Sequence, residues 1–204
     1  MIGIACGGKP IAGIVNQPFF TQNIHDPDGD RVIWAIDGLG AFHNSEKRDK
    51  FEKLESLEKK LKESEERKKG VLAKKYQLIT TRSHLTEIVK NGLENIPNCE
   101  LIHRGGSGYK TLCVIEGSSD CYLYPRNGTK RWDTCAPEAI LRALGGRFTD
   151  VFNNQYDYSA IYDKNIVENW FGIVATIVDH DYFLNNLNQD LLEHVKKIHK
   201  SSVC

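Results

Sequence analysis

The sequence predicts a mixed α/β fold for this chain of 204 residues. Short alternating apolar runs at residues 2–5, 11–15 and 31–36 are typical of strands. Two further apolar runs, at 76–80 and 100–103, each end in a polar cluster that precedes an amphipathic segment, which is the pattern of a strand-to-helix turn. The hydrophobic fraction of 40% is sufficient for a core in one domain.

The first strands are expected to be joined by tight turns. Gly7-Gly8-Lys9 predicts a hairpin turn between the first two apolar runs. Gly38 and Gly40 predict a second turn after the third run. Asp26-Pro27-Asp28-Gly29-Asp30 is rich in turn-forming residues and predicts a turn between strands rather than a metal loop.

Residues 46–69 are dominated by charged side chains, and we expect them to form a solvated helix. Phe51 and Leu61 belong to a set of apolar residues at helical spacing. Opposite charges four residues apart, such as Glu55 and Lys59, add about 0.3–0.5 kcal/mol per pair. The alternative is a helix that docks on a coiled-coil partner, although the apolar stripe covers less than two full heptads.

The rest of the chain is expected to alternate strands and helices. We predict strands at 120–124, 147–152 and 170–177 and helices at 108–116, 135–144 and 180–199. The helix at 135–144 has the clearest bounds, because Pro137 suits a first turn and Gly145-Gly146 suits a left-handed stop. Asp133 then lies just before this helix, where an aspartate can cap free N–H groups.

The turn Arg104-Gly105-Gly106-Ser107-Gly108-Tyr109-Lys110 suits a phosphate group. Helix starts in open α/β sheets present free N–H groups to anions, and the lysine adds a positive charge. The spacing is not that of a Walker loop, and the motif also fits an ordinary tight turn. In the preceding polar cluster, Ser83 could cap a helix and His84 could face solvent.

Five segments, taken in their order, closely resemble the C-terminal half of the 3′(2′),5′-bisphosphate nucleotidase family. They are Thr80-Thr81-Arg82-Ser83-His84, Gly105-Gly106-Ser107-Gly108-Tyr109-Lys110, Ile115-Glu116-Gly117, Trp132-Asp133-Thr134-Cys135-Ala136-Pro137-Glu138 and Gly145-Gly146-Arg147-Phe148-Thr149-Asp150. That family consists of lithium-sensitive, magnesium-dependent phosphatases of the inositol monophosphatase superfamily. The opening strands look similar as well, so the resemblance covers nearly the whole chain apart from residues near 45–75 and the tail.

The resemblance implies the layered αβαβα sugar-phosphatase fold, here mainly its C-terminal mixed-sheet domain. Residues 1–44 would be strands that belong to the N-terminal domain of such a protein. Residues 45–75 would be a charged helical insertion, and residues 76–204 would form the C-terminal α/β domain.

The resemblance also implies a binding site. Asp133 matches the family aspartate that ligates a catalytic magnesium ion, and Thr81, His84, Gly106 and Lys110 match the nucleotide contacts. Chemistry supports this division, since Mg²⁺ prefers carboxylate oxygen whereas a nucleoside phosphate suits hydroxyl, imidazole, backbone N–H and ammonium groups. The implied reaction removes the 3′-phosphate of adenosine 3′,5′-bisphosphate to give AMP, with metal ions polarising the phosphoryl group and activating water.

The chain departs from the family pattern in what it lacks. Members of the family supply most metal ligands and the water-activating residues from an early Asp, a helical Glu and an Asp-Pro-x-Asp-Gly-Thr loop, and we find no counterpart here. We therefore expect a truncated chain without catalytic residues of its own, because one carboxylate is too few ligands for an active magnesium cluster. A non-catalytic nucleotide-binding remnant and an inositol phosphate phosphatase are the alternatives.

Composition points to a cytoplasmic protein, and the small-molecule nucleotide as partner is what the resemblance implies. The 27 basic and 27 acidic residues cancel, which argues against a nucleic-acid polymer as partner. No apolar run approaches the roughly 20 residues that a membrane span needs, and Met1 does not begin a signal-peptide pattern. The six cysteines show no Cys-x-x-Cys pair, which suits free thiols in a reducing compartment.

Overall fold

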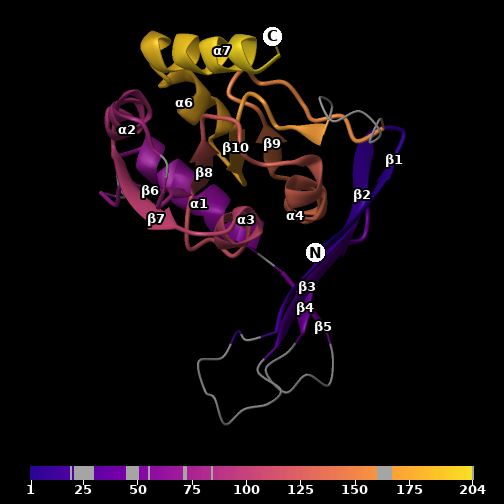
Figure 1. The fold of residues 1–204 in the computed structure, drawn as a ribbon. Coiled ribbons are helices and arrows are strands. Elements are labelled where there is room, and N and C mark those ends of the chain that lie inside the picture. The colour runs from indigo at the N-terminus through magenta and orange to yellow at the C-terminus, as the bar shows by residue number, and fades with distance from the viewer. Residues whose placement is uncertain are drawn as a thin grey trace.

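The computed structural model describes residues 1–18, 20, 30–44, 51–54, 56–70, 73–83, 85–159 and 167–203. Within these residues the chain forms two five-stranded sheets, A and B, with helices between them and beyond the second sheet (Figure 1). The mixed α/β fold class predicted from the sequence is confirmed.

Sheet A is an antiparallel meander in which each strand pairs with the next along the chain. Its strands are β1 (Ile2–Cys6), β2 (Lys9–Gln17), β3 (Arg31–Ile36), β4 (Gly40–Asn44) and β5 (Phe51–Lys53). The predicted turn at Gly7-Gly8 is confirmed, and both glycines adopt the positive φ that such a turn requires. The turn predicted at Asp26-Pro27-Asp28-Gly29 lies outside the described residues.

Sheet B is mixed, with the strand order β7-β6-β8-β10-β9. Its strands are β6 (Tyr76–Thr81), β7 (Cys99–Arg104), β8 (Cys121–Tyr124), β9 (Arg147–Thr149) and β10 (Ile173–Thr176). Strands β7, β6 and β8 are parallel, so their carboxyl ends meet at one edge, whereas β10 runs antiparallel to β8 and β9. Strand β9 is shorter than predicted, because the Asp150 carboxylate accepts the Phe152 N–H at 2.8 Å and turns the chain.

Helices form two layers around sheet B (Figure 1). Helices α3 (Ser107–Ile115) and α4 (Arg131–Ala143) pack between the two sheets, while α2 (Glu87–Glu94), α6 (His180–Asn185) and α7 (Gln189–Val203) cover the far face of sheet B. The predicted single helix at 180–199 is therefore wrong. It breaks into α6 and α7 because the Asn188 side chain accepts the Leu191 N–H at 2.8 Å and starts a new helix.

Helix α4 begins four residues earlier than predicted, at Arg131, which places Pro137 in its interior. The proline cannot donate to the carbonyl of Asp133, yet the helix continues because its following residues, including Ile140 and Leu141, are fully buried. Asp133 lies in the first turn of α4 and not before the helix. The predicted stop is confirmed, with Gly145 at a φ of 80° after the last helical turn.

Two glycines let α4 approach the backbone of sheet A. A Cβ atom on Gly3 of β1 would lie 2.6 Å from the Cys135 Sγ atom, and one on Gly13 of β2 would overlap the Ala136 carbonyl. No larger side chain fits at either position without moving the helix. This contact fixes α4, and Asp133 with it, against the first sheet.

The charged segment forms β5 followed by helix α1 (Ser56–Lys68), so the predicted helix is confirmed over α1 and is wrong at Phe51–Lys53, which form a strand. Leu61, a member of the predicted apolar stripe, is 48% exposed, whereas Lys60 and Ser64 are buried. The Lys60 Nζ atom lies 2.7 Å from Asp120 Oδ1, and the Ser64 hydroxyl donates to Asp179 Oδ1 at 2.7 Å. Helix α1 thus docks through polar groups, because the Asp120 and Asp179 carboxylates accept its hydrogen bonds at the edge where β6 and β8 begin.

No helix in the described part of the chain combines the length and the apolar character needed to cross a membrane.

Candidate functional site

A cavity of about 200 Å³ opens at the carboxyl ends of β6 and β8, beside the first turns of α3 and α4. It is lined by Thr81, Ser107, Lys110, Tyr122, Tyr124, Gly128, Thr129 and Asp133. Three of the five residues that the sequence nominates, Thr81, Lys110 and Asp133, come together here. Parallel strands produce this arrangement, since their carboxyl ends and the helix starts that follow share one edge of the sheet.

Lys110 is a buried ammonium in this cavity. Its side chain is 4% exposed, its Nζ atom donates to the Gly106 carbonyl at 3.1 Å, and it lies 4.9 Å from the centre of the Tyr122 ring. Among the described residues no carboxylate forms an ion pair with it. Burial lowers the pKa of Lys110 from 10.5 to about 8. An ammonium held in this way, without a counter-ion, favours the arrival of an anion.

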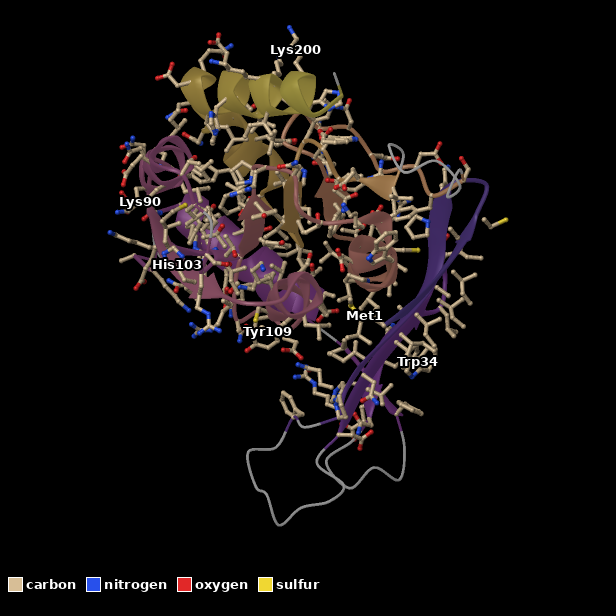
Figure 2. All side chains as sticks on the ribbon, viewed as in Figure 1. Met1, Trp34, Lys90, His103, Tyr109 and Lys200 are labelled. Atoms are coloured by element: carbon tan, nitrogen blue, oxygen red, sulfur yellow. The ribbon has the colours of Figure 1, made fainter. Side chains whose placement is uncertain are left out.

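The glycine turn before α3 presents the start of that helix to the cavity. Gly106 is the N-cap residue, and its φ of 75° lies in the region that glycine tolerates. Within the described residues no side chain caps α3, so its first N–H groups are available to another acceptor. Tyr109, the neighbour of Lys110 on α3, is 42% exposed and points outward from the body of the molecule (Figure 2). Helix α3 therefore turns its lysine inward and its tyrosine to solvent.

Asp133 is oriented by the backbone just ahead of it. The Lys130 N–H donates to Asp133 Oδ2 at 2.9 Å, while the Lys130 carbonyl accepts the Asp133 N–H at 2.9 Å. Among the described residues no group donates a hydrogen bond to the other carboxylate oxygen, Oδ1. Asp133 is thus both a helix cap and a cavity-lining carboxylate with one oxygen to spare, so the two interpretations of its sequence position are compatible.

The remaining predicted residues lie close to the cavity or outside the described part of the chain. Thr81 ends β6, and its hydroxyl accepts the Ser83 N–H at 3.4 Å. Gly106 precedes the lining residue Ser107. His84 lies outside the described residues, so its proposed nucleotide contact stays a prediction.

Two tyrosines of the cavity were missed by the sequence analysis. Tyr122 and Tyr124 alternate with Cys121 and Leu123 along β8, and the tyrosines face the helices between the sheets. Burial raises the pKa of both phenols, which keeps them protonated as hydrogen-bond donors. The alternation of period two was available in the sequence, but which face of β8 meets the cavity depends on the sheet order.

Thr129 and Gly128 were missed for a different reason. They lie in the loop between β8 and α4, and the Thr129 hydroxyl accepts a hydrogen bond from the buried Asn169 side chain at 3.0 Å. Asn169 is 40 residues away in sequence, so no local pattern could have placed Thr129 at the cavity.

The described residues offer one candidate magnesium ligand. Asp133 suits the role, because it lines the cavity and, within the described part of the chain, one of its carboxylate oxygens accepts no hydrogen bond. No group of three or more His, Cys, Asp or Glu side chains able to hold a metal ion occurs in the described part of the chain.

Known proteins match both the sequence and the fold. The Inositol monophosphatase family matches residues 1–196. The chain is 37% identical to 3'(2'),5'-bisphosphate nucleotidase 1 of Dictyostelium discoideum over 202 residues, which are 96% of this chain and 57% of that protein. It is 30% identical to inositol polyphosphate 1-phosphatase of Bos taurus over 151 residues, 71% of this chain and 36% of that protein.

A solved structure extends the likeness to the fold. The crystal structure of Staphylococcal IMPase-II superposes with a TM-score of 0.65 at 16% sequence identity, covering 99% of this chain and 66% of that chain. The chain belongs to the inositol monophosphatase family, as the sequence resemblance indicated. It spans 57% of the length of its Dictyostelium relative.

Proposed function

We propose that this chain forms the nucleotide-binding part of a magnesium-dependent phosphatase that removes the 3′-phosphate of adenosine 3′,5′-bisphosphate to give AMP. One observation carries the proposal: Lys110 and Asp133 line the same cavity, and among the described residues the buried Lys110 ammonium has no carboxylate partner and one Asp133 oxygen accepts no hydrogen bond. A phosphate accompanied by a divalent cation needs both charges. The name of the Dictyostelium relative supports the nucleotide as substrate.

The residues of this chain bind and orient the substrate. Lys110 and the uncapped N-terminus of α3 attract the phosphate, and Thr81 and Tyr122 offer hydroxyl groups to it. Asp133 would be one ligand of a magnesium ion. The other ligands would come from the part of the Dictyostelium relative that lies outside the matched residues. We also propose a cytoplasmic location, which the free thiols of Cys6, Cys99, Cys113, Cys121 and Cys135 support.

The second candidate substrate is an inositol phosphate, which the name of the bovine relative favours. The third possibility is a protein that binds the nucleotide without hydrolysing it. The three candidate functions can be distinguished experimentally, because each predicts a different result when the same nucleotide and inositol phosphates are added.

The test measures phosphate release from adenosine 3′,5′-bisphosphate and from inositol phosphates, with and without Mg²⁺. It compares this chain with a chimera that adds the unmatched part of the Dictyostelium nucleotidase. Magnesium-dependent release from the nucleotide, lost in Asp133→Asn with the fold retained, supports the proposal. Preferential release from an inositol phosphate supports the second candidate. Nucleotide binding without release in either protein supports the third and contradicts catalysis.

A further inference from the structure

We propose that Asn169 is a positioning residue that sets the orientation of the Asp133 carboxylate. Asn169 lies in the turn before β10, is completely buried, and directs its side chain at the start of α4. The proposal rests on the function proposed above, in which Asp133 serves a metal ion, but the geometry that carries it belongs to this chain alone.

The Asn169 side chain contacts three consecutive residues. Its Nδ2 atom donates to the Thr129 hydroxyl at 3.0 Å and to the Lys130 carbonyl at 2.9 Å. Its Oδ1 atom accepts a hydrogen bond from the Arg131 guanidinium. A carbonyl and a guanidinium admit one amide orientation, since the first can only accept and the second can only donate. Every hydrogen-bonding function of the amide but one lone pair is therefore committed to this turn.

Backbone contacts reinforce the same turn. The Asn169 N–H donates to the Thr129 carbonyl at 2.9 Å, and the Asn169 carbonyl accepts the Gly172 N–H at 3.2 Å. Glu168, the preceding residue, forms an isolated β-bridge and an ion pair with Lys130. The segment around Asn169 and the segment before α4 thus form one hydrogen-bonded unit.

Lys130 connects this hydrogen-bonded unit to Asp133. Its carbonyl accepts both the Asn169 Nδ2 donor and the Asp133 N–H. Its N–H donates to Asp133 Oδ2 and belongs to the peptide group whose Thr129 carbonyl accepts the Asn169 N–H, so both peptide groups that flank Lys130 join Asn169 to Asp133. Without the Asn169 side chain the Lys130 carbonyl and the Thr129 hydroxyl would lose buried donors, and the turn that holds Asp133 at the cavity would loosen.

The experiment uses the 204-residue chain and compares wild type with Asn169→Asp and Asn169→Ala. The aspartate keeps the shape and the acceptor for Arg131 but removes both donors. Amide hydrogen exchange at Lys130 reports the bond to Asp133, and we expect it to become roughly tenfold faster when this bond loosens. Titration with adenosine 3′,5′-bisphosphate in Mg²⁺ should show affinity roughly 10–100-fold weaker.

Thr176→Val is the matched control, because Thr176 is also fully buried and its hydroxyl also bonds a side chain, His180 Nδ1, at 2.9 Å. Thr176 lies opposite Cys121, at the end of β8 far from Tyr124, so this change should lower stability without altering Lys130 exchange or nucleotide affinity. If Asn169→Ala fails to fold, Arg131→Met removes the donor to Asn169 Oδ1 from the surface side and should also speed Lys130 exchange.

The outcomes separate the two proposals. Unchanged Lys130 exchange in folded Asn169 variants overturns the positioning role, whatever the nucleotide does. Faster exchange with weaker nucleotide binding supports both proposals. Faster exchange in a chain that binds no nucleotide even as wild type upholds the positioning of Asp133 and contradicts the proposed function of the cavity.

Discussion

Replacing Glu138 by glutamine should remove a pH dependence of stability from this protein. Glu138 lies on α4, fully buried between the sheets. Its Oε2 atom accepts the Tyr158 hydroxyl at 2.6 Å, and its Oε1 atom is 3.6 Å from Arg142, too far for a hydrogen bond. Burial dominates over these contacts and raises the pKa of Glu138 from 4.5 to about 7.

A raised carboxyl pKa means that the folded state binds the proton more tightly than the unfolded state. The stability that this proton contributes is fully present below the unfolded pKa of 4.5 and is lost as the pH rises through about 7. The shift corresponds to about 3 kcal/mol in total, of which about 2.5 kcal/mol should disappear between about pH 5 and about pH 8. Glutamine has the size of the neutral acid and no proton to lose.

The assay is urea unfolding of wild type and Glu138→Gln at about pH 5 and about pH 8, with the free energy of unfolding taken by linear extrapolation. The difference between the two proteins should change by about 2.5 kcal/mol between the two pH values, in favour of the variant at the higher pH. Glu65→Gln, a substitution at a carboxyl 70% exposed on α1, is the control and should leave the pH profile unchanged. Parallel profiles for wild type and Glu138→Gln would refute the argument from burial.

Three further predictions follow from single contacts. Wild-type affinity for adenosine 3′,5′-bisphosphate should decline above about pH 8, where Lys110 loses its proton, and Lys110→Met should weaken binding and abolish this decline. Calorimetric titration across that pH range measures the affinity, and a decline that persists in the variant would contradict the role of Lys110. Asp120→Asn should destabilise the fold by about 3–5 kcal/mol, because it removes the buried carboxylate that pairs with both Lys60 and Arg67, and an unchanged urea midpoint would contradict this. Gly13→Ala should cost about 1–3 kcal/mol, because the added methyl group meets the Ala136 carbonyl, and a melting temperature equal to that of wild type would show that α4 can shift freely.

Three strands of sheet A and the start of α3 could be predicted from the sequence because their signals are local. Period-two alternation with glycine turns defined β1, β2 and β3, and a glycine turn ahead of apolar residues defined the start of α3. The start of α4 could not be placed correctly, because proline usually occupies the first turn of a helix. In α4 the helix begins at Arg131 and Pro137 lies in its interior, where burial between the two sheets maintains the helix.

The candidate site divides in the same way. Thr81, Lys110 and Asp133 stand in motifs that can be found one at a time, and the strand-to-helix rule then brings them to one edge of the sheet. Thr129 and Asn169 meet across a gap of 40 residues, through a buried amide that no periodicity marks. Local sequence patterns indicate the candidate ligand-binding groups, whereas the proposed positioning residue Asn169 is found only through tertiary contacts.

Helix α1 is the clearest case in which the pattern and the packing disagree. Leu61 belongs to the apolar stripe at helical spacing and is 48% exposed, whereas Lys60 and Ser64 face the protein. The reason lies outside the helix, in the buried Asp120 carboxylate, which also accepts the Gln77 N–H at 2.8 Å where β6 begins. An unpaired buried carboxylate costs more than one exposed leucine, so the polar face is the one that docks.

This docking mode also places the charged helix where it leaves the cavity untouched. Asp120 precedes β8 and Asp179 follows β10, which runs antiparallel to β8, so both carboxylates belong to the edge opposite Thr81 and Tyr124. A segment that packs at the amino ends of parallel strands adds polar contacts without approaching the carboxyl ends, where the helix starts and the candidate ligand-binding groups gather. Sheet B therefore separates the charged helix α1 from the candidate site.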